Sequence, residues 1–230
     1  MLFRSRLLPQ VFYYFLLAKL GASAGSAHGR PGPIVSVPSG NFGNLTAGLI
    51  AKRLGLHVSQ FIAATNVNDV VPEYLRTGIY SPRASVRTVA NAMDVGAPSN
   101  FERIRALYND DLEAIRHDIA GAVYDDAAVV AEIGRVHRRY GYLLDPHGAI
   151  AWLALNDALK TAGPQARGVF LATAHPAKFR DVVGPAIGEE VPLPTALEAA
   201  LAKPRHSTPL DARYDALLQL LRSNVGVGIA

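Results

Sequence analysis

Short apolar runs alternate with amphipathic stretches along this chain, and the alternation predicts strands separated by helices. Residues 34–37 (IVSV) are apolar and β-branched, which is typical of a buried strand. After a glycine-rich turn, four apolar side chains share one face of a predicted helix that ends at Gly55: Leu45, Leu49, Ile50 and Leu54. Residues 58–64 form a second apolar run. This order of strand, loop, helix and strand predicts a parallel pair with a right-handed crossover.

The alternation resumes after one irregular stretch. Residues 66–100 are rich in Asn, Pro, Ser and Thr and show little periodicity, which is typical of a long functional segment. Helices are predicted at 101–119, 127–140 and 146–160, a short strand at 142–144, a third clear strand at 168–172, and a helix from about Pro176. An amphipathic helix carries Tyr214, Leu217, Leu218 and Leu221. The predicted fold class is α/β with a mostly parallel sheet.

The first thirty residues allow two interpretations. Arg4 and Arg6 precede an apolar run at residues 7–17, and the small residues at 22–24 resemble the cleavage site of a secretory signal peptide. Pro9 interrupts that run near its start, which favours a buried helix with Pro9 in its first turn and Gly21 as its stop. The run is too short to cross a membrane. We therefore expect residues 1–30 to be a helix and connector, and residues 31–230 to be the α/β domain.

Composition excludes several classes of function. The chain has 230 residues, of which 50% are hydrophobic and 18% charged, so it is a folded protein rather than a disordered one. It contains no cysteine, which rules out disulfides, zinc–thiolate sites, iron–sulfur clusters and a cysteine nucleophile. The net charge of +4 comes from scattered cations, so we expect no nucleic-acid partner. The histidines lack metal-ligand spacing, and no serine lies in a G-x-S-x-G motif, so we expect no metal site and no hydrolase triad.

Two loops directly after predicted strands carry candidate chemistry. The first (SGNFGN, residues 39–44) runs into a helix, where glycines and free amides favour an anion. Gly40 and Gly43 are three residues apart and do not form the G-x-G-x-x-G motif of dinucleotide sites. The loop also lacks the G-K-[ST] ending of a nucleoside-triphosphate loop, so it predicts a cradle for a single phosphate. The alternative is that its glycines serve packing alone.

The second loop (TAHPAKF, residues 173–179) places a hydroxyl, an imidazole and an ammonium together. Thr173 is suited to face a ring nitrogen of a ligand, and His175 and Lys178 are suited to hold an anion. The alternative is that Thr173 caps a helix before Pro176. A third turn, residues 145–148 (DPHG), presents His147 at a helix start, although helix capping by Asp145 explains this turn more simply.

With these loops in view, the sequence resembles threonine synthase, a pyridoxal-phosphate enzyme of the tryptophan-synthase-β fold type. The matching words occur in family order: LLPQVFYYF (7–15), VPSGNFGNLTAGLIAKRLGL (37–56), FIAATNVNDVVPEYL (61–75), NAMDVGAPSNFERI (91–104), LDPHGAIA (144–151) and LATAHPAKF (171–179). The resemblance covers most of the chain from about residue 7. It implies the parallel-sheet domain of the fold-type-II pyridoxal-phosphate enzymes, incomplete at its N-terminus. It also argues against a signal peptide, because LLPQVFYYF matches an internal helix of the family.

The resemblance implies a lyase that converts O-phospho-L-homoserine and water to L-threonine and phosphate in threonine biosynthesis. Pyridoxal 5'-phosphate would be the cofactor, with its phosphate held by the loop residues Gly40, Asn41, Phe42, Gly43 and Asn44. Thr173 would face the pyridine nitrogen, where a neutral hydroxyl does not enforce a full ring charge. For the substrate phosphate, our own inference adds Ser99, Asn100 and Arg103 to His175 and Lys178. We expect a cytoplasmic protein without a membrane partner.

One departure from the family matters for activity. The Schiff-base lysine of the family lies upstream in a motif that ends in Phe-Lys-Asp, and none of the five lysines here has that context: Lys19, Lys52, Lys160, Lys178 and Lys203. We therefore expect the chain to be the C-terminal part of the fold and to be inactive alone, with no catalytic lysine of its own. Three hypotheses follow: a fragment of an active enzyme, half of a split enzyme whose N-terminal half is a separate chain, or a non-catalytic module that binds pyridoxal phosphate or another small phosphate.

Overall fold

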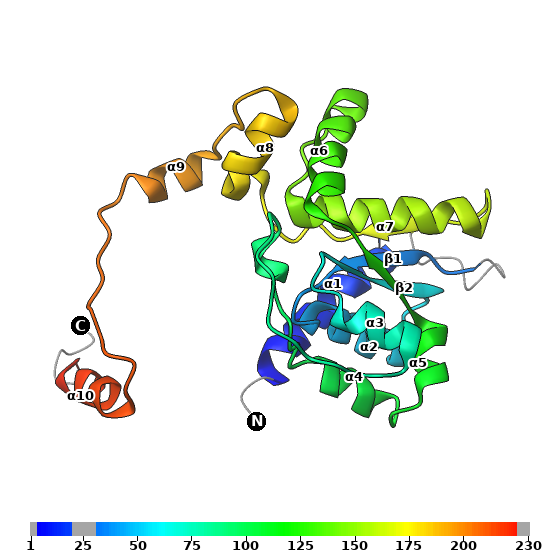
Figure 1. Cartoon of the computed structure of the whole chain (residues 1–230), viewed down its shortest axis with the longest axis horizontal. Coiled ribbons are helices and arrows are strands. Elements are labelled where there is room, and N and C mark those ends of the chain that lie inside the picture. The colour runs from blue at the N-terminus through cyan, green and yellow to red at the C-terminus, as the bar shows by residue number, and fades with distance from the viewer. Residues whose placement is uncertain (1–3, 20–30, 225–230) are drawn as a thin grey trace. The chain divides into compact units, whose positions relative to one another are not determined.

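A four-stranded parallel sheet organises the first of two compact units of this chain. The computed structural model describes residues 4–19 and 31–224, and it divides into Met1–Pro192 and Leu193–Ala230. In the first unit the strand order is β3-β2-β1-β4, with every pairing parallel (Figure 1). The strands are β1 (Ile34–Pro38), β2 (Gln60–Thr65), β3 (Ile119–Val123) and β4 (Gly168–Phe170). β1 is buried along its whole length because it is an inner strand covered on both faces.

Helices cover both faces of this sheet (Figure 1). On one face, α7 (Pro146–Ala162) crosses all four strands, and α6 (Asp126–Tyr140) packs on α7 and on α8 (Arg180–Ile187). On the other face lie α2 (Gly43–Arg53), α3 (Val70–Thr77) and α5 (Leu112–Asp118), with α1 (Arg4–Lys19) and α4 (Phe101–Leu107) packed against α2. The described part of the unit also contains two short 3₁₀ turns, η2 (Asn91–Met93) and η3 (Pro176–Phe179). The second unit contains α9 (Thr195–Leu201) and α10 (Tyr214–Asn224).

Most of the predicted regular elements are confirmed, and so is the α/β class. The runs at 34–37, 58–64 and 168–172 are strands, and the predicted helices at 127–140 and 146–160 match α6 and α7 within two residues. The amphipathic helix near the C-terminus is α10, whose Tyr214, Leu217 and Leu221 are exposed. Residues 1–30 include α1, as expected, while the predicted stop at Gly21 and the connector up to residue 30 lie outside the described residues.

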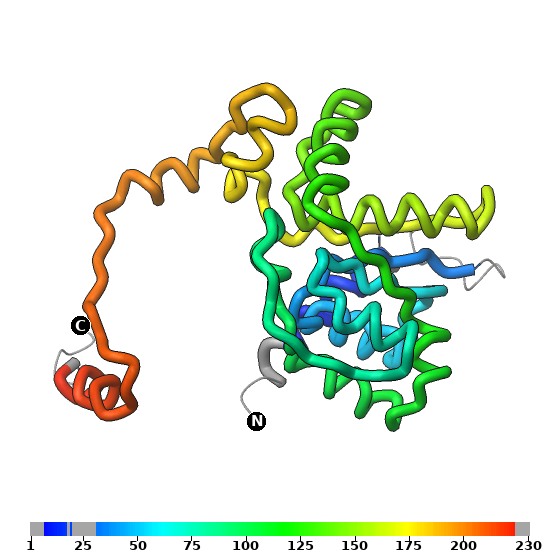
Figure 2. Tube along the Cα trace, in the orientation of Figure 1, coloured from blue at the N-terminus to red at the C-terminus, as the bar shows by residue number. Residues whose placement is uncertain are grey.

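Three predicted elements are wrong because local signals were misjudged. The irregular stretch 66–100 contains α3, whose Pro72 occupies the first turn, where a missing N–H costs nothing. Beyond α3, the chain follows the extended path seen in Figure 2 until η2. The predicted helix 101–119 is two helices, because Asn109 and Asp110 adopt left-handed φ values of 52° and 60°. The predicted strand at 142–144 is irregular chain.

Two further corrections concern a missed strand and a proline. β3 follows α5 without a turn residue between them and consists of Ile-Ala-Gly-Ala-Val, whose small residues have weak strand propensity. Pro9 is the sixth residue of α1 rather than part of its first turn, so it removes one intrahelical hydrogen bond from the second turn. α1 nevertheless buries Val11, Tyr14 and Leu17 against the core, which offsets that loss.

Asp118, the last residue of α5, contacts three side chains, one of which is Lys52 of α2. Lys52 Nζ lies 2.8 Å from Asp118 Oδ1, the Tyr108 hydroxyl donates to Oδ2 at 2.6 Å, and His117 Nδ1 lies 2.9 Å from Oδ1. Burial pushes the pKa of Asp118 upward, but these hydrogen bonds and the Lys52 charge outweigh it and lower the pKa below its ordinary value of 3.8. The ionised carboxylate is therefore the form that the folded state favours.

Stability should consequently depend on acid pH through this residue. A lowered pKa contributes stability that is present above the unfolded value and is lost as pH falls through the folded pKa. We expect the thermal midpoint to drop between about pH 5 and pH 3, and Asp118→Asn to show a smaller drop with a lower midpoint at neutral pH. Glu102→Gln, exposed on α4, is the control and should keep the wild-type slope. An unchanged slope in Asp118→Asn would contradict the assignment.

Candidate functional site

A cleft of about 1110 Å³ opens at the carboxyl ends of β1 and β4, where parallel sheets bind ligands. Its walls come from five parts of the chain: α1, the turn between β1 and α2, η2, the start of α7, and the segment from Phe170 to Phe179. Among the described residues that line it there is no carboxylate, while Lys178, His147 and several amides contribute hydrogen-bond donors. The cleft is therefore chemically suited to an anionic ligand.

The turn Ser39–Asn44 contributes free backbone amides to this cleft. Phe42, the residue before α2, has φ 59° and ψ 16° and provides no side-chain cap. Within the described part of the chain, the backbone N–H groups of Asn41, Phe42, Gly43 and Asn44 have no protein acceptor. A helix start with unpaired N–H groups and its positive dipole end is a ready anion site.

The side chain of Asn44 holds this turn closed from within. Its Oδ1 accepts from the Ser39 hydroxyl at 2.7 Å and from Leu45 N–H at 2.9 Å, and its Nδ2 donates to Pro38 carbonyl at 2.8 Å. The Tyr14 hydroxyl of α1 donates to the Asn44 carbonyl at 2.7 Å. Burial raises the pKa of Tyr14, so its hydroxyl remains a donor at all physiological pH values.

Two contacts fix the same turn from outside. Asn41 Oδ1 accepts from the Ser99 N–H at 2.6 Å and from the Ser99 hydroxyl at 3.1 Å, which ties the turn to the segment before α4. A Cβ at Gly40 would lie 2.7 Å from Met93 Cα, so only glycine fits against η2. Gly40 thus permits close approach of the η2 backbone, which agrees with the alternative that the glycines of this loop serve packing. The residue of the turn with left-handed φ is Phe42.

The segment after β4 forms the opposite wall. Thr173 is exposed in the cleft, together with Lys178, whose Nζ lies 5.9 Å from the centre of the Phe179 ring. His175 is the N-cap of η3, and its Nδ1 accepts from Ala177 N–H at 3.1 Å. Helix capping by Thr173, the alternative considered from the sequence, is therefore wrong, because His175 takes that place.

The structure brings together most, but not all, of the site residues predicted from sequence. The cleft is lined by Gly40, Asn41, Phe42, Gly43, Asn44, Thr173 and Lys178. Four predicted substrate residues do not line it: Ser99, Asn100, Arg103 and His175. Ser99 binds Asn41 behind the turn, and Asn100 Oδ1 accepts from Arg103 Nη1 at 2.5 Å. Their proposed contact with a substrate phosphate stays a prediction.

Several residues that line the cleft were not among the predicted site residues, and most of them lie outside the two candidate loops. These are Gln10 and Tyr13 of α1, Met93 of η2, and the later residues His147, Phe170 and Phe179. The signal available for His147 was its place in the DPHG turn, which was assigned to capping alone. Asp145 does cap α7, since it accepts from Gly148 N–H at 3.1 Å, but it also binds the His147 ring.

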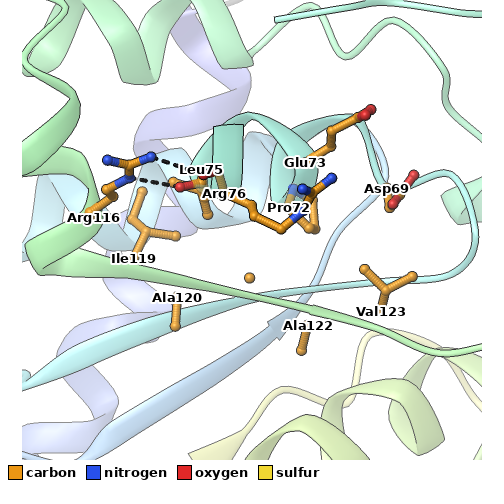
Figure 3. A pocket seen from close by; sticks show the side chains of 11 residues that line it. Asp69, Pro72, Glu73, Leu75, Arg76, Arg116, Ile119, Ala120, Ala122 and Val123 are labelled. Atoms are coloured by element: carbon orange, nitrogen blue, oxygen red, sulfur yellow. Dashed lines mark hydrogen bonds between the residues drawn. The ribbon is translucent and has the colours of Figure 1, made fainter. Parts of the chain in front are cut away.

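A second, smaller hollow of about 360 Å³ lies between α3 and the edge strand β3 (Figure 3). Arg116 projects over it and donates to the carbonyls of Leu75 and Arg76, at 2.7 and 3.1 Å. Its carboxylates, Asp69 and Glu73, both pair with Arg83. Its charged groups are thus largely committed to protein partners, and none of the predicted site residues lines it.

The parallel sheet, its helices on both faces and the glycine turn at the strand ends define the class. This is the α/β domain of the fold-type-II pyridoxal-phosphate enzymes, as predicted. Solved structures with the same fold include threonine synthase from Escherichia coli, with a TM-score of 0.82 and 42% identity over 96% of this chain and 49% of that chain. A second is the pyridoxal-phosphate-bound threonine synthase from Brucella melitensis, with a TM-score of 0.84 and 33% identity over 96% of this chain and 51% of that one.

Sequence comparison finds similarity to one family in particular. The profile described as "Threonine synthase, C-terminal" matches residues 148–220. Threonine synthase from Serratia marcescens is 44% identical over 218 residues, which are 94% of this chain and 48% of that protein. The chain therefore spans about half the length of the curated relatives it matches. Across the described residues, no helix is both long and apolar enough to cross a membrane.

The Asn44 network predicts a clear loss of stability. Asn44→Ala removes three hydrogen bonds of a partly buried side chain and leaves the Pro38 carbonyl without its side-chain donor, so we expect a cost of about 1–3 kcal/mol in free energy of unfolding. Asn91→Ala, at an exposed position on the same cleft, should cost less than about 0.5 kcal/mol. Urea denaturation of both variants measures this, and equal costs would refute a special role for Asn44.

Proposed function

We propose that this chain is the cofactor-phosphate half of a threonine synthase. In this proposal it binds pyridoxal 5'-phosphate and, together with the N-terminal half of the fold, converts O-phospho-L-homoserine and water to L-threonine and phosphate. The observation that carries the proposal is the run of unpaired amides at Asn41–Asn44, at the start of α2, in a cleft lined by no carboxylate among its described residues. The protein would be a cytoplasmic lyase whose partner is a small molecule.

The residues present fit the proposed cofactor. The free amides of Asn41–Asn44 would bind its phosphate, and the exposed hydroxyl of Thr173 would meet the pyridine nitrogen from the opposite wall. When bound, pyridoxal phosphate supplies an electron-withdrawing ring that stabilises negative charge on an amino-acid substrate. Thr173 would orient this ring without forcing a full positive charge on it. The buried rings of Phe42 and Phe179 exclude water from parts of the wall.

The chain has no lysine in the sequence context of the family's Schiff-base residue. Lys178 is the one lysine among the described residues that line the cleft, and it belongs to the TAHPAKF word rather than to a Phe-Lys-Asp motif. Within the proposal, the N-terminal half supplies the lysine that moves protons on the substrate, as upstream sequence or as a separate chain. The chain alone would therefore bind the cofactor but lack most of the rate enhancement that acid–base groups and proximity give.

An exposed apolar face of α1 supports the need for a second half. Five large side chains are exposed there: Leu8, Phe12, Tyr13, Phe15 and Leu16, with Phe12 exposed by 72% and Tyr13 by 71%. Contiguous apolar surface of this kind is typical of an interface. Gln10 and Tyr13 also line the cleft, so a segment that covered α1 would lie beside the ligand.

Substitution of Gly43 tests the phosphate turn. A Cβ there would lie 3.3 Å from Asn100 Nδ2 and 3.5 Å from Leu7 Cδ2, so Gly43→Leu must displace the turn. We expect at least a tenfold weaker affinity for pyridoxal phosphate, which is about 1.4 kcal/mol, measured by equilibrium dialysis. The control is Ala200→Leu, at an exposed position of α9, which should bind like the wild type. Wild-type affinity in Gly43→Leu would remove the turn from the proposal.

Mass measurement after borohydride reduction tests the missing lysine. With pyridoxal phosphate and this chain alone, we expect no stoichiometric adduct. After addition of the N-terminal half of a related threonine synthase, we expect one adduct on that half and release of phosphate from O-phospho-L-homoserine. A stoichiometric adduct on Lys178 of the isolated chain would contradict the proposal. If the chain binds pyridoxal phosphate but forms no adduct and gains no activity with the added N-terminal half, the alternative is favoured. That alternative is a non-catalytic module for pyridoxal phosphate or another small phosphate.

A further inference from the structure

The buried pair Asp145 and His147 has one hydrogen-bonding atom left over. His147 Nδ1 lies 2.7 Å from Asp145 Oδ2, and both side chains are at least 96% buried, with exposures of 4% for His147 and 2% for Asp145. The His147 Nε2 atom is buried without a hydrogen-bond partner in the described part of the chain. An imidazole nitrogen left unpaired in a protein interior destabilises the folded state.

The position of the His147 ring indicates a ligand as the missing hydrogen-bond partner of Nε2. His147 is one of the residues that line the cleft, on the same side as Lys178 and Phe179. Its ring packs edge-on against Phe179, with ring centres 4.9 Å apart and an interplanar angle of 60°. Asp145 holds the ring from one side and Phe179 from another, so the imidazole cannot rotate freely to find another partner. Buried unpaired polar atoms in native proteins call for a specific explanation of this kind.

Capping of α7 does not account for this arrangement. Asp145 alone satisfies the first amides of α7, through His147 N–H at 3.1 Å and Gly148 N–H at 3.1 Å. Any residue at position 147 supplies that backbone N–H, so the cap requires no imidazole. An apolar side chain of similar size would fill the same volume without burying an unpaired nitrogen. The ring therefore has a use other than stability.

We propose that Asp145 and His147 form a binding dyad, in which Asp145 orients the ring and His147 Nε2 makes a hydrogen bond to the phosphorylated ligand of the cleft. The dyad rests on the proposed function, because it assigns a further contact to the same pyridoxal-phosphate site. It joins two words that are distant in sequence, DPHG at 145–148 and TAHPAKF at 173–179, in one wall. In this proposal, the contact that His147 makes with the ligand is additional to those of the loop SGNFGN and of Thr173.

Binding of pyridoxal phosphate to variants of the full chain tests the dyad. We expect His147→Leu to weaken binding about tenfold or more, as loss of a hydrogen bond to a charged ligand does, while its thermal midpoint stays at or above that of the wild type. His147→Gln, which keeps a polar group near Nε2, should recover most of the affinity. His206→Leu, an exposed histidine of the second unit, is the matched control and should bind like the wild type.

A spectroscopic readout keeps the test valid if His147→Leu is poorly folded. In wild-type chain labelled with ¹⁵N-histidine, addition of pyridoxal phosphate should shift the Nε2 resonance of His147, identified by its loss in His147→Gln. If the wild type binds pyridoxal phosphate but this resonance does not move and His147→Leu binds equally well, the dyad is refuted and the proposed function stands. If the wild type does not bind pyridoxal phosphate, both proposals fail.

Discussion

The turn between β1 and α2 must close tightly and still leave its amides free, and the site depends on this requirement. A turn normally closes through its own backbone hydrogen bonds, which would consume the N–H groups that an anion needs. Here the Asn44 side chain provides the closing bonds instead, to Ser39, Leu45 and Pro38. Phe42 adopts a left-handed conformation that costs about 1–2 kcal/mol, which its burial within the core offsets.

Close packing of α1, α2 and β2 is what brings Tyr14 to this turn. A Cβ at Gly48 would lie 2.8 Å from atoms of both the Tyr14 and Phe61 rings, so glycine allows the two rings to meet at 76° over α2. Only at this distance does the Tyr14 hydroxyl reach the Asn44 carbonyl. Core packing and the geometry of the site are therefore linked. Because Gly48 of α2 has no side chain, Tyr14 of α1 packs close enough for its hydroxyl to contact the turn.

The elements on either side of the turn could be predicted from the sequence because their signals are local. The strand at 34–37, the glycine turn and the helix after it each carry a short-range pattern, and the structure has all three. β3 was missed since its small residues continue the end of a helix, and the break at Asn109 and Asp110 depends on left-handed backbone that no periodicity reveals. The contacts of Met93 with Gly40, and of His147 with Phe179, join segments about 53 and 32 residues apart, so only the folded chain shows them.

The described residues that stabilise the turn Ser39–Asn44 belong to this chain, so ligand binding can be considered separately from catalysis. Tyr14, Asn44, Met93 and Ser99, which contact the turn, all belong to the described part of this chain. Proton transfer is different, because it needs a group at the reacting atoms. Under the proposed function, the lysine that would provide this group lies in the N-terminal half of the fold. Under the proposed function, this chain would keep a preorganised anion site without the lysine chemistry, so ligand binding and catalysis can be measured one at a time.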